Sequence, residues 1–333
     1  MHLNSTLSKK ILIWYDNSKR DLPWRVSKKS TKKLYYRFLS EFMLQQTQVK
    51  TVIPYFNKFI KRFKTLESLS KSNEKNILKL WEGLGYYRRA RNLLASAKML
   101  VKQYNSKLPK TIKEIKKLPG VGVYTANALV GLIYDQPTVA VDGNVKRVFA
   151  RILNKKEEKI NFEQLILLNS KNLFNTNRNA DFIEALMEFG ALICKPKDPI
   201  CGACCLNKNC KYFKSSYKIT TTNKRKVKEM NYDIFCYLNK KKQIALTKEN
   251  KISFLKNFNL PAIKKAKNIS KKKNWKFLKS YKNSISNLKL NINLYYKFSN
   301  KIPSTYNWYL LKNNKEFIPS FTKKIFKQIS ILF

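Results

Sequence analysis

Residues 118–126 read Leu-Pro-Gly-Val-Gly-Val-Tyr-Thr-Ala and lie between two segments with apolar residues at helical spacing. Gly120 and Gly122 allow a tight turn that opens directly into the second helix. Such a turn exposes backbone N–H groups at the positive end of a helix, where they can bind a phosphate. Taken alone, the pattern fits an ordinary helix–helix turn equally well, so both interpretations stay open here.

The chain around this turn, up to about residue 210, carries apolar residues every three or four positions, broken by short polar segments or by Pro and Gly. Ile77, Trp81 and Leu84 belong to one such group. This part of the chain is therefore predicted to be all-helical. We expect helices over residues 33–52, 54–63, 74–80, 87–103, 111–118, 125–133, 144–152 and 180–193.

The composition changes toward the C-terminus, because all eight glycines lie at or before Gly202. Apolar and aromatic residues alternate at 232–238 and 288–296, which favours strands. We therefore expect a helical region over 1–210, a basic linker over 211–230 and a smaller α+β domain over 231–333. Asn residues are expected at the positive-φ turn positions that Gly usually occupies.

The net charge is +49, from 69 Lys and Arg against 20 Asp and Glu, which indicates a polyanionic partner such as nucleic acid. Part of the Lys excess fits compositional drift on solvent-exposed faces, since Asn and Ile are also abundant. Ten of the eleven Arg lie at or before Arg178, so binding is expected to concentrate there. The chain has neither a membrane-length apolar run nor an apolar signal core at its start, and we expect a cytoplasmic protein.

Five of the six cysteines lie close together, and clustered thiols in a reducing compartment indicate a metal site. Their chemistry alone fits a tetrahedral zinc and a cubane iron–sulfur cluster equally well. Cys205 is out of register and Cys236 lies in a predicted strand, so both are expected to be structural thiols. The spacing C-x6-C-x2-C-x5-C selects four ligands, Cys194, Cys201, Cys204 and Cys210.

Two carboxylates are candidates for catalysis, although each has a simpler interpretation. Asp142 precedes the helix expected from Asn144, where an Asp commonly serves as N-cap. Glu41 lies in the segment Leu-Ser-Glu-Phe-Met-Leu-Gln-Gln-Thr-Gln-Val at 39–49 and alone reads as an exposed helix carboxylate. The single histidine is His2, which excludes a His base, a Ser–His pair and a His-ligated zinc.

Together these motifs resemble the MutY-type adenine DNA glycosylases, which belong to the helix-hairpin-helix, iron–sulfur endonuclease III superfamily. The segment 39–49 resembles the signature helix of that family, 118–126 its DNA-binding hairpin, and the cysteine spacing its [4Fe–4S] loop. The match is dense from residue 11 to about 210 and faint beyond. It implies a two-lobed helical body, with the hairpin in one lobe and the N-terminal helix and cluster in the other.

The resemblance implies base-excision repair, in which adenine paired with 8-oxoguanine or guanine in double-stranded DNA is removed by hydrolysis of its N-glycosidic bond. It makes Glu41 the acid that protonates N7 of the flipped adenine. Asp142 then stabilises the oxocarbenium-like sugar and Asn144 holds that carboxylate. Tyr124 stands where bifunctional relatives carry a Schiff-base lysine, which implies a monofunctional enzyme.

The resemblance also assigns residues around the base and along the DNA. The adenine pocket is expected to include Trp24, Arg25 and Glu184, and one [4Fe–4S] cluster is expected on the four cysteines. The loop at 83–92 is expected to enter the base stack, with its tyrosine as the wedge. The predicted mispair and DNA contacts are Gln46, Thr47, Leu84, Tyr86, Gly120, Gly122 and Lys146.

The C-terminal domain of the family is Nudix-like and checks for 8-oxoguanine with a Phe-Ser-His loop. The best counterpart here is Ile-Ser-Asn at 285–287, so Ser286 is the expected contact of a degenerate recognition loop. A monomer in the bacterial cytoplasm, associated with the nucleoid, is expected. Two alternatives remain: an endonuclease III-like pyrimidine glycosylase with lyase activity, opposed by Glu41 and Tyr124, and a non-catalytic DNA-binding remnant, opposed by the intact Glu41, Asp142 and cysteines.

Overall fold

The structure is a computed structural model that describes residues 5–138, 140–155, 161, 164, 176–215, 228–250, 252, 255–266, 274–285, 288–312 and 316–333. The chain divides into two compact units, Met1–Thr221 and Thr222–Phe333. The expected recognition residue Ser286 lies outside the described residues. Among the helices that are described, none combines the length and apolar character needed to cross a bilayer.

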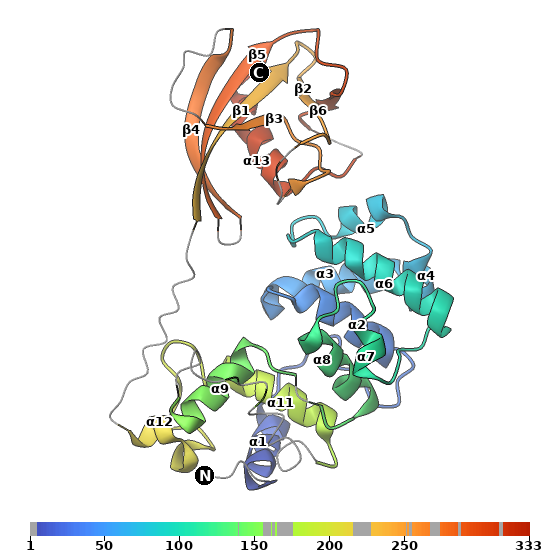
Figure 1. Cartoon of the computed structure of the whole chain (residues 1–333), viewed down its shortest axis with the longest axis vertical. Coiled ribbons are helices and arrows are strands. Elements are labelled where there is room, and N and C mark those ends of the chain that lie inside the picture. Colours follow the sequence, from blue (N-terminus) through green and yellow to red (C-terminus); the bar gives the residue numbers. More distant parts are fainter. Residues whose placement is uncertain are drawn as a thin grey trace. The chain divides into compact units, whose positions relative to one another are not determined.

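The first unit is helical and has two lobes (Figure 1). One lobe contains α2 Lys33–Leu44, α3 Val49–Arg62, α4 Leu66–Ser70, α5 Glu74–Leu80, α6 Arg88–Tyr104, α7 Ile112–Ile115 and α8 Val123–Tyr134. The other contains α1 Ser5–Ser18, α9 Gly143–Leu153, α11 Asn179–Leu192, the 3-10 turn η2 Asn207–Asn209 and α12 Lys211–Lys214. Helix α11 joins the lobes, because it packs against α1 and α9 on one side and against α8 on the other.

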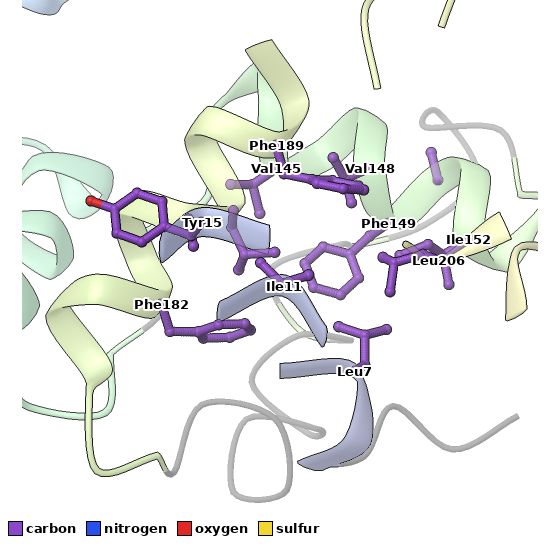
Figure 2. Close-up of a cluster of buried hydrophobic side chains, with 13 residues drawn as sticks. Leu7, Ile11, Tyr15, Val145, Val148, Phe149, Ile152, Phe182, Phe189 and Leu206 are labelled. Carbon is purple, nitrogen blue, oxygen red and sulfur yellow. The ribbon is translucent and has the colours of Figure 1, made fainter. Parts of the chain in front are cut away.

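The core of the second lobe explains why the N-terminal helix packs beside helices far along the chain (Figure 2). Ile11, Phe149, Phe182 and Phe189 are fully buried there. Burying one such side chain stabilises the fold by roughly 1.5–3 kcal/mol. The complete cluster comprises Leu7, Ile11, Tyr15, Val145, Val148, Phe149, Ala150, Ile152, Phe182, Ala185, Leu186, Phe189 and Leu206.

The continuous helix expected over 33–52 is wrong, because α2 ends at Leu44 and α3 begins at Val49. Gln46 has φ of 56°, a left-handed conformation that no α-helix contains. The apolar spacing continues through the break, so periodicity did not reveal it. The next expected helix start, Pro54, is also wrong, because this proline lies inside α3.

The second unit contains a mixed sheet of order β4-β5-β1-β2-β6, with β3 also paired to β1. Helix α13 Ser320–Ile329 buries Phe321, Ile325 and Ile329. The strands expected near 232–238 and 288–296 are confirmed, and they pair in parallel. The strands are β1 Lys228–Leu238, β2 Gln243–Leu246, β3 Ala262–Lys265, β4 Lys276–Ile285, β5 Leu288–Phe298 and β6 Asn307–Leu310.

Left-handed turn positions in this glycine-free unit are occupied as expected in two of three described cases. Asn257 and Asn274 have φ of 64° and 73°, and Lys242 has φ of 55°. Asn tolerates this region because its short polar side chain can hydrogen-bond locally. In the segment expected to be a linker, α12 covers Lys211–Lys214 and β1 already begins at Lys228.

Candidate active site

Glu41 is buried rather than exposed on the surface of α2. Only 6% of the residue is accessible, and its neighbours Phe38, Leu39 and Phe42 are fully buried. Burial raises the pKa of its carboxyl to about 7, and the nearby carboxylates of Glu184 and Asp142 act in the same direction, while Arg37 opposes them. A carboxyl that is half protonated near neutral pH is suited to act as a general acid.

Asp142 is both an N-cap and a neighbour of this acid. Its Oδ1 accepts a 2.7 Å hydrogen bond from the backbone N–H of Val145, and its Oδ2 accepts a 2.8 Å bond from Nδ2 of Asn144. Burial raises the pKa of Asp142, although these hydrogen bonds act against the rise. The cap therefore fixes the orientation of a carboxylate that faces Glu41 from the other lobe.

Tyr124, at the start of α8, lies against both carboxylates. Burial raises the pKa of its phenol far above the usual value, and the charges of Glu41 and Asp142 raise it further. The hydroxyl lies 3.8 Å from Sδ of Met187 on α11. The position that the hairpin presents to the site therefore holds a neutral phenol.

Asn144 is held by Arg147 and by a close approach of α11. Nη2 of Arg147 donates 2.8 Å and 2.7 Å bonds to Oδ1 of Asn144 and the carbonyl of Gly190, and its Nε donates a 2.8 Å bond to the carbonyl of Cys194. A Cβ at Gly190 would lie 2.6 Å from Cβ of Asn144 and 3.0 Å from its backbone. Glycine is therefore needed for α11 to approach this turn.

Glu184 lies at the centre of a buried polar network. Its carboxylate accepts bonds from the hydroxyl of Tyr15 at 2.8 Å, from Nε of Arg25 at 2.9 Å and from Nη1 of Arg37. Burial would raise its pKa, but the charges of Arg37 and Arg25 and these hydrogen bonds bring the pKa below its usual value. Sequence reasoning identified Arg25 and Glu184 and missed Tyr15 and Arg37. The spacing of Arg37 one turn before Glu41 was the available signal.

Trp24 is only 2% exposed and packs edge-on against Phe56, with ring centroids 5.3 Å apart. Its ring therefore belongs to the core of the first lobe. Arg25, next to it, reaches Glu184 and also donates a 3.0 Å bond to Glu188.

Three of the four residues at 83–86, in the loop between α5 and α6, have positive φ angles. Gly83, Gly85 and Tyr86 have φ of 101°, 75° and 47°. Tyr86 is 41% exposed, whereas Leu84 is only 5% exposed and packs in the core. The loop therefore presents Tyr86 to solvent and buries Leu84.

Arg89 ties this loop to the end of α2. Its Nη1 donates 2.6 Å bonds to the carbonyls of Met43 and Gln45, and its Nη2 donates longer bonds, of 3.4 and 3.3 Å, to those of Leu84 and Gly85. Burial lowers the pKa of the guanidinium to about 10, where it remains charged at neutral pH. One buried cation thus caps α2 and holds the Tyr86 loop.

The hairpin has the backbone needed to bind a phosphate. Gly120 has φ of 79°, and a Cβ there would lie 2.5 Å from Nδ2 of Asn92. Gly122 is the N-cap of α8 and makes no side-chain cap hydrogen bond, and the following Val123 is 49% exposed, so the start of this helix is accessible. Gln45 Nε2 lies 3.3 Å from the carbonyl of Gly120, which brings the α2–α3 loop beside the hairpin.

The remaining predicted DNA contacts are accessible to different degrees. Gln46 is exposed, and Thr47 and Lys146 are partly exposed. Gln46 and Thr47 lie in the loop that separates α2 from α3, directly after the helix that carries Glu41.

One small cavity is lined by four cysteines, Cys194, Cys201, Cys204 and Cys210. Cys205 is not part of the lining and packs against the core of the second lobe instead. Nη1 of Arg151 lies 3.4 Å from Sγ of Cys194, and the N–H of Leu206 lies 3.4 Å from Sγ of Cys204, so charged and backbone donors point at the sulfurs. Within the described part of the chain, no three Cys, His, Asp or Glu side chains are close enough to form a metal-binding group. Four thiols around one cavity are a donor set that suits an iron–sulfur cluster or a tetrahedral zinc ion.

Comparisons with known proteins agree with this geometry. Residues 39–169 match the HhH-GPD superfamily of base excision DNA repair proteins. The chain is 37% identical over 326 residues to an adenine DNA glycosylase of Buchnera aphidicola subsp. Baizongia pistaciae, covering 91% of this chain and 90% of that protein.

Among solved structures, a thermostable thymine-DNA glycosylase is 30% identical, with a TM-score of 0.56 over 63% of this chain and 95% of that one. A trapped endonuclease III–DNA covalent intermediate is 22% identical, with a TM-score of 0.51 over 62% and 93%, and shows the shared fold. The helical unit thus has the helix-hairpin-helix glycosylase fold, and the chain belongs to the adenine DNA glycosylase family of base excision repair proteins.

Proposed function

We propose that this protein is a monofunctional adenine DNA glycosylase that hydrolyses the N-glycosidic bond of adenine paired with 8-oxoguanine or guanine in double-stranded DNA. The observation that carries the proposal is the buried Glu41, whose pKa lies at about 7 and which shares its site with Asp142. The family relationship to adenine DNA glycosylases supports the same activity.

Glu41 supplies the proton in the first step. Adenine leaves poorly as an anion, so donating a proton to N7 of the flipped base makes a neutral leaving group. A carboxyl with a pKa at about 7 holds a proton in about half of the molecules at neutral pH and gives it up readily. Glu184 stays ionised beside Arg25 and Arg37 and offers an acceptor to the exocyclic amine of the base.

Asp142 acts on the sugar as the bond breaks. Its carboxylate, fixed by the N–H of Val145 and the amide of Asn144, is largely buried and stabilises the developing oxocarbenium charge. Water then adds to the sugar and leaves an abasic site. Tyr124 has no amine that could form a Schiff base, so the chain is expected not to cleave the strand.

DNA contacts are assigned to the hairpin and the loops around it. The N–H groups after Gly120 and Gly122 would bind a phosphate at the start of α8, and Lys146 would contact the backbone nearby. Tyr86 would enter the stack at the mispair, while Gln46 and Thr47 would face the orphaned base. A [4Fe–4S] cluster would be held by four cysteines, Cys194, Cys201, Cys204 and Cys210. The cluster would order a basic loop that contacts the DNA.

The second unit is assigned the role of checking the base opposite adenine, as a degenerate Nudix-like domain in which Ser286 is the expected contact. A β sheet with a helix packed on it supports a mixed α+β unit of this kind. The protein is expected to act as a monomer on the nucleoid of a bacterial cytoplasm.

The test is single-turnover base release from duplexes with A opposite 8-oxoguanine, G or T, and from a duplex with an oxidised pyrimidine, each analysed with and without alkali. Adenine release opposite 8-oxoguanine, with strand breaks only after alkali, is the expected result. Alkali-independent cleavage at the pyrimidine lesion would assign an endonuclease III-like activity, and binding without release would assign a non-catalytic remnant.

A further inference from the structure

Arg37 lies between two of the carboxylates of the site. It precedes Glu41 by four residues on α2, so the two side chains lie on the same face of the helix one turn apart. Each residue is only 6% exposed. Nη1 of Arg37 donates to Oε1 of Glu184 on α11, which joins the helix of the acid to the helix of the adenine pocket.

The groups that act on Glu41 come from four elements. The charges of Arg37 on α2, Asp142 at the start of α9 and Glu184 on α11 act on its carboxyl, and the phenol of Tyr124 on α8 is close enough for Glu41 to raise its pKa. Of these, Arg37 is the only cation within the described part of the chain. Arg147 acts on Asp142 and Arg25 acts on Glu184, so neither replaces it at Glu41.

One hydrogen-bond donor of the Arg37 guanidinium has no protein partner among the described residues. That donor is Nε, which is buried. The side-chain hydrogen bond of Arg37 goes to Glu184, so the guanidinium lies between this carboxylate and the helix that carries Glu41.

We propose that Arg37 is a further positioning residue of this site, whose guanidinium orients the carboxylate of Glu184 and balances the negative charge that faces Glu41. The inference rests on the proposed adenine glycosylase activity. It predicts that Arg37 sets the pH at which Glu41 loses its proton and the enzyme loses its acid. Without the guanidinium, the carboxyl should stay protonated to higher pH, because Arg37 lowers the pKa that burial raises.

The experiment measures single-turnover adenine release from the A:8-oxoguanine duplex against pH for the full chain and four variants. Arg37→Met removes the charge and the donors, Arg37→Gln keeps a donor for Glu184 without the charge, and Arg37→Lys keeps the charge. Glu184 retains Arg25 and Tyr15 in each of them. Arg20→Met is the matched control, because Arg20 is partly exposed and pairs with Glu188, away from Glu41.

The basic limb of the profile is expected to move up by about one pH unit in Arg37→Met and Arg37→Gln. It should stay near that of the parent protein in Arg37→Lys and Arg20→Met. A uniform loss of rate at every pH in Arg37→Gln, with an unmoved limb, would overturn the inference and leave Arg37 a structural residue. If Arg37→Met does not fold, the comparison of Arg37→Gln with Arg37→Lys tests the inference by itself. If the parent protein releases no adenine, the proposed function fails and this inference with it, whereas an active parent with unmoved variants removes only the inference.

Discussion

The side-chain amide of Asn144 donates a 2.8 Å hydrogen bond to Oδ2 of Asp142, while Oδ1 of the same carboxylate caps α9. In the proposed mechanism one carboxylate therefore has a structural and a catalytic task at once. The two can be separated, because Asn is as good an N-cap as Asp but carries no charge.

Asp142→Asn should fold with a stability about 1–3 kcal/mol below that of the parent protein, because its amide can keep the helix cap but then turns an NH₂ toward the donor amide of Asn144. Its rate of adenine release should fall at least about 100-fold, because the charge that stabilises the sugar cation is lost. Single-turnover assays and thermal melts check the two parts. The matched control is Asn73→Ser at the N-cap of α5, which should change neither. Normal turnover by Asp142→Asn would leave Asp142 as a helix cap alone.

Glu41→Gln should abolish excision and keep DNA binding, since the amide has the shape of the acid but no proton to give. Gel-shift binding to the A:8-oxoguanine duplex and single-turnover assays test both. In the parent protein the rate should fall as the pH rises through about 7, because only protonated Glu41 acts as the acid. Measurable base release by the glutamine variant would falsify the assignment.

Stability should also depend on Glu41. Its pKa rises from 4.5 to about 7 on folding, so its contribution is complete below pH 4.5 and is lost as the pH rises through 7. The loss is at most about 3 kcal/mol. Denaturant unfolding at pH 5 and pH 8 should show a smaller decrease in Glu41→Gln than in the parent protein. Equal decreases in both proteins would mean that the pKa of Glu41 is not raised on folding.

Cys204→Ser should lose the broad absorbance near ~400 nm expected of a [4Fe–4S] protein, together with its iron. Cys205→Ser is the control, because Cys205 does not line the cavity of the other four, and it should keep both. Absorbance spectra and metal analysis of the purified proteins are sufficient. A colourless parent protein that contains zinc would contradict the cluster.

Arg89→Met should destabilise the protein by about 2–4 kcal/mol, because several buried carbonyls lose a charged donor. It should also weaken the preference for mispairs, since both the Tyr86 loop and the Gln45 carbonyl lose their common anchor. Melting temperatures and rates on A:8-oxoguanine against A:T measure the two effects. Arg88→Met, at an exposed neighbouring position, should leave both unchanged.

Much of the helical unit could be predicted from the sequence, because apolar periodicity is local and strong in helices such as α5 and α11. The break at Gln46 could not be predicted, because the carbonyl of Gln45 just before it is bonded by Arg89, which lies 44 residues further along the chain. The family likewise follows from the motifs at 39–49 and 118–126. The burial of Leu84 and Trp24 required the tertiary structure, because the same side chains could equally face DNA.

Residues that act through others were the least predictable part of the site. Arg37 and Tyr15 have no motif of their own, and their roles appear only when α1, α2 and α11 meet at Glu184. In the second unit, alternation predicted the long strands β1 and β5. Their parallel pairing did not follow from the sequence, because alternation does not specify which strands become neighbours.

Gly190 carries no functional group, yet its missing side chain determines how close α11 can come to Asn144. In a library of single substitutions scored for repair, this position should therefore be as intolerant as Asp142. Such a map would mark Gly190 as if it were catalytic, although it contributes only space. Neither small nor polar residues should be tolerated at this position, since even the methyl group of alanine would meet the backbone of the neighbouring turn.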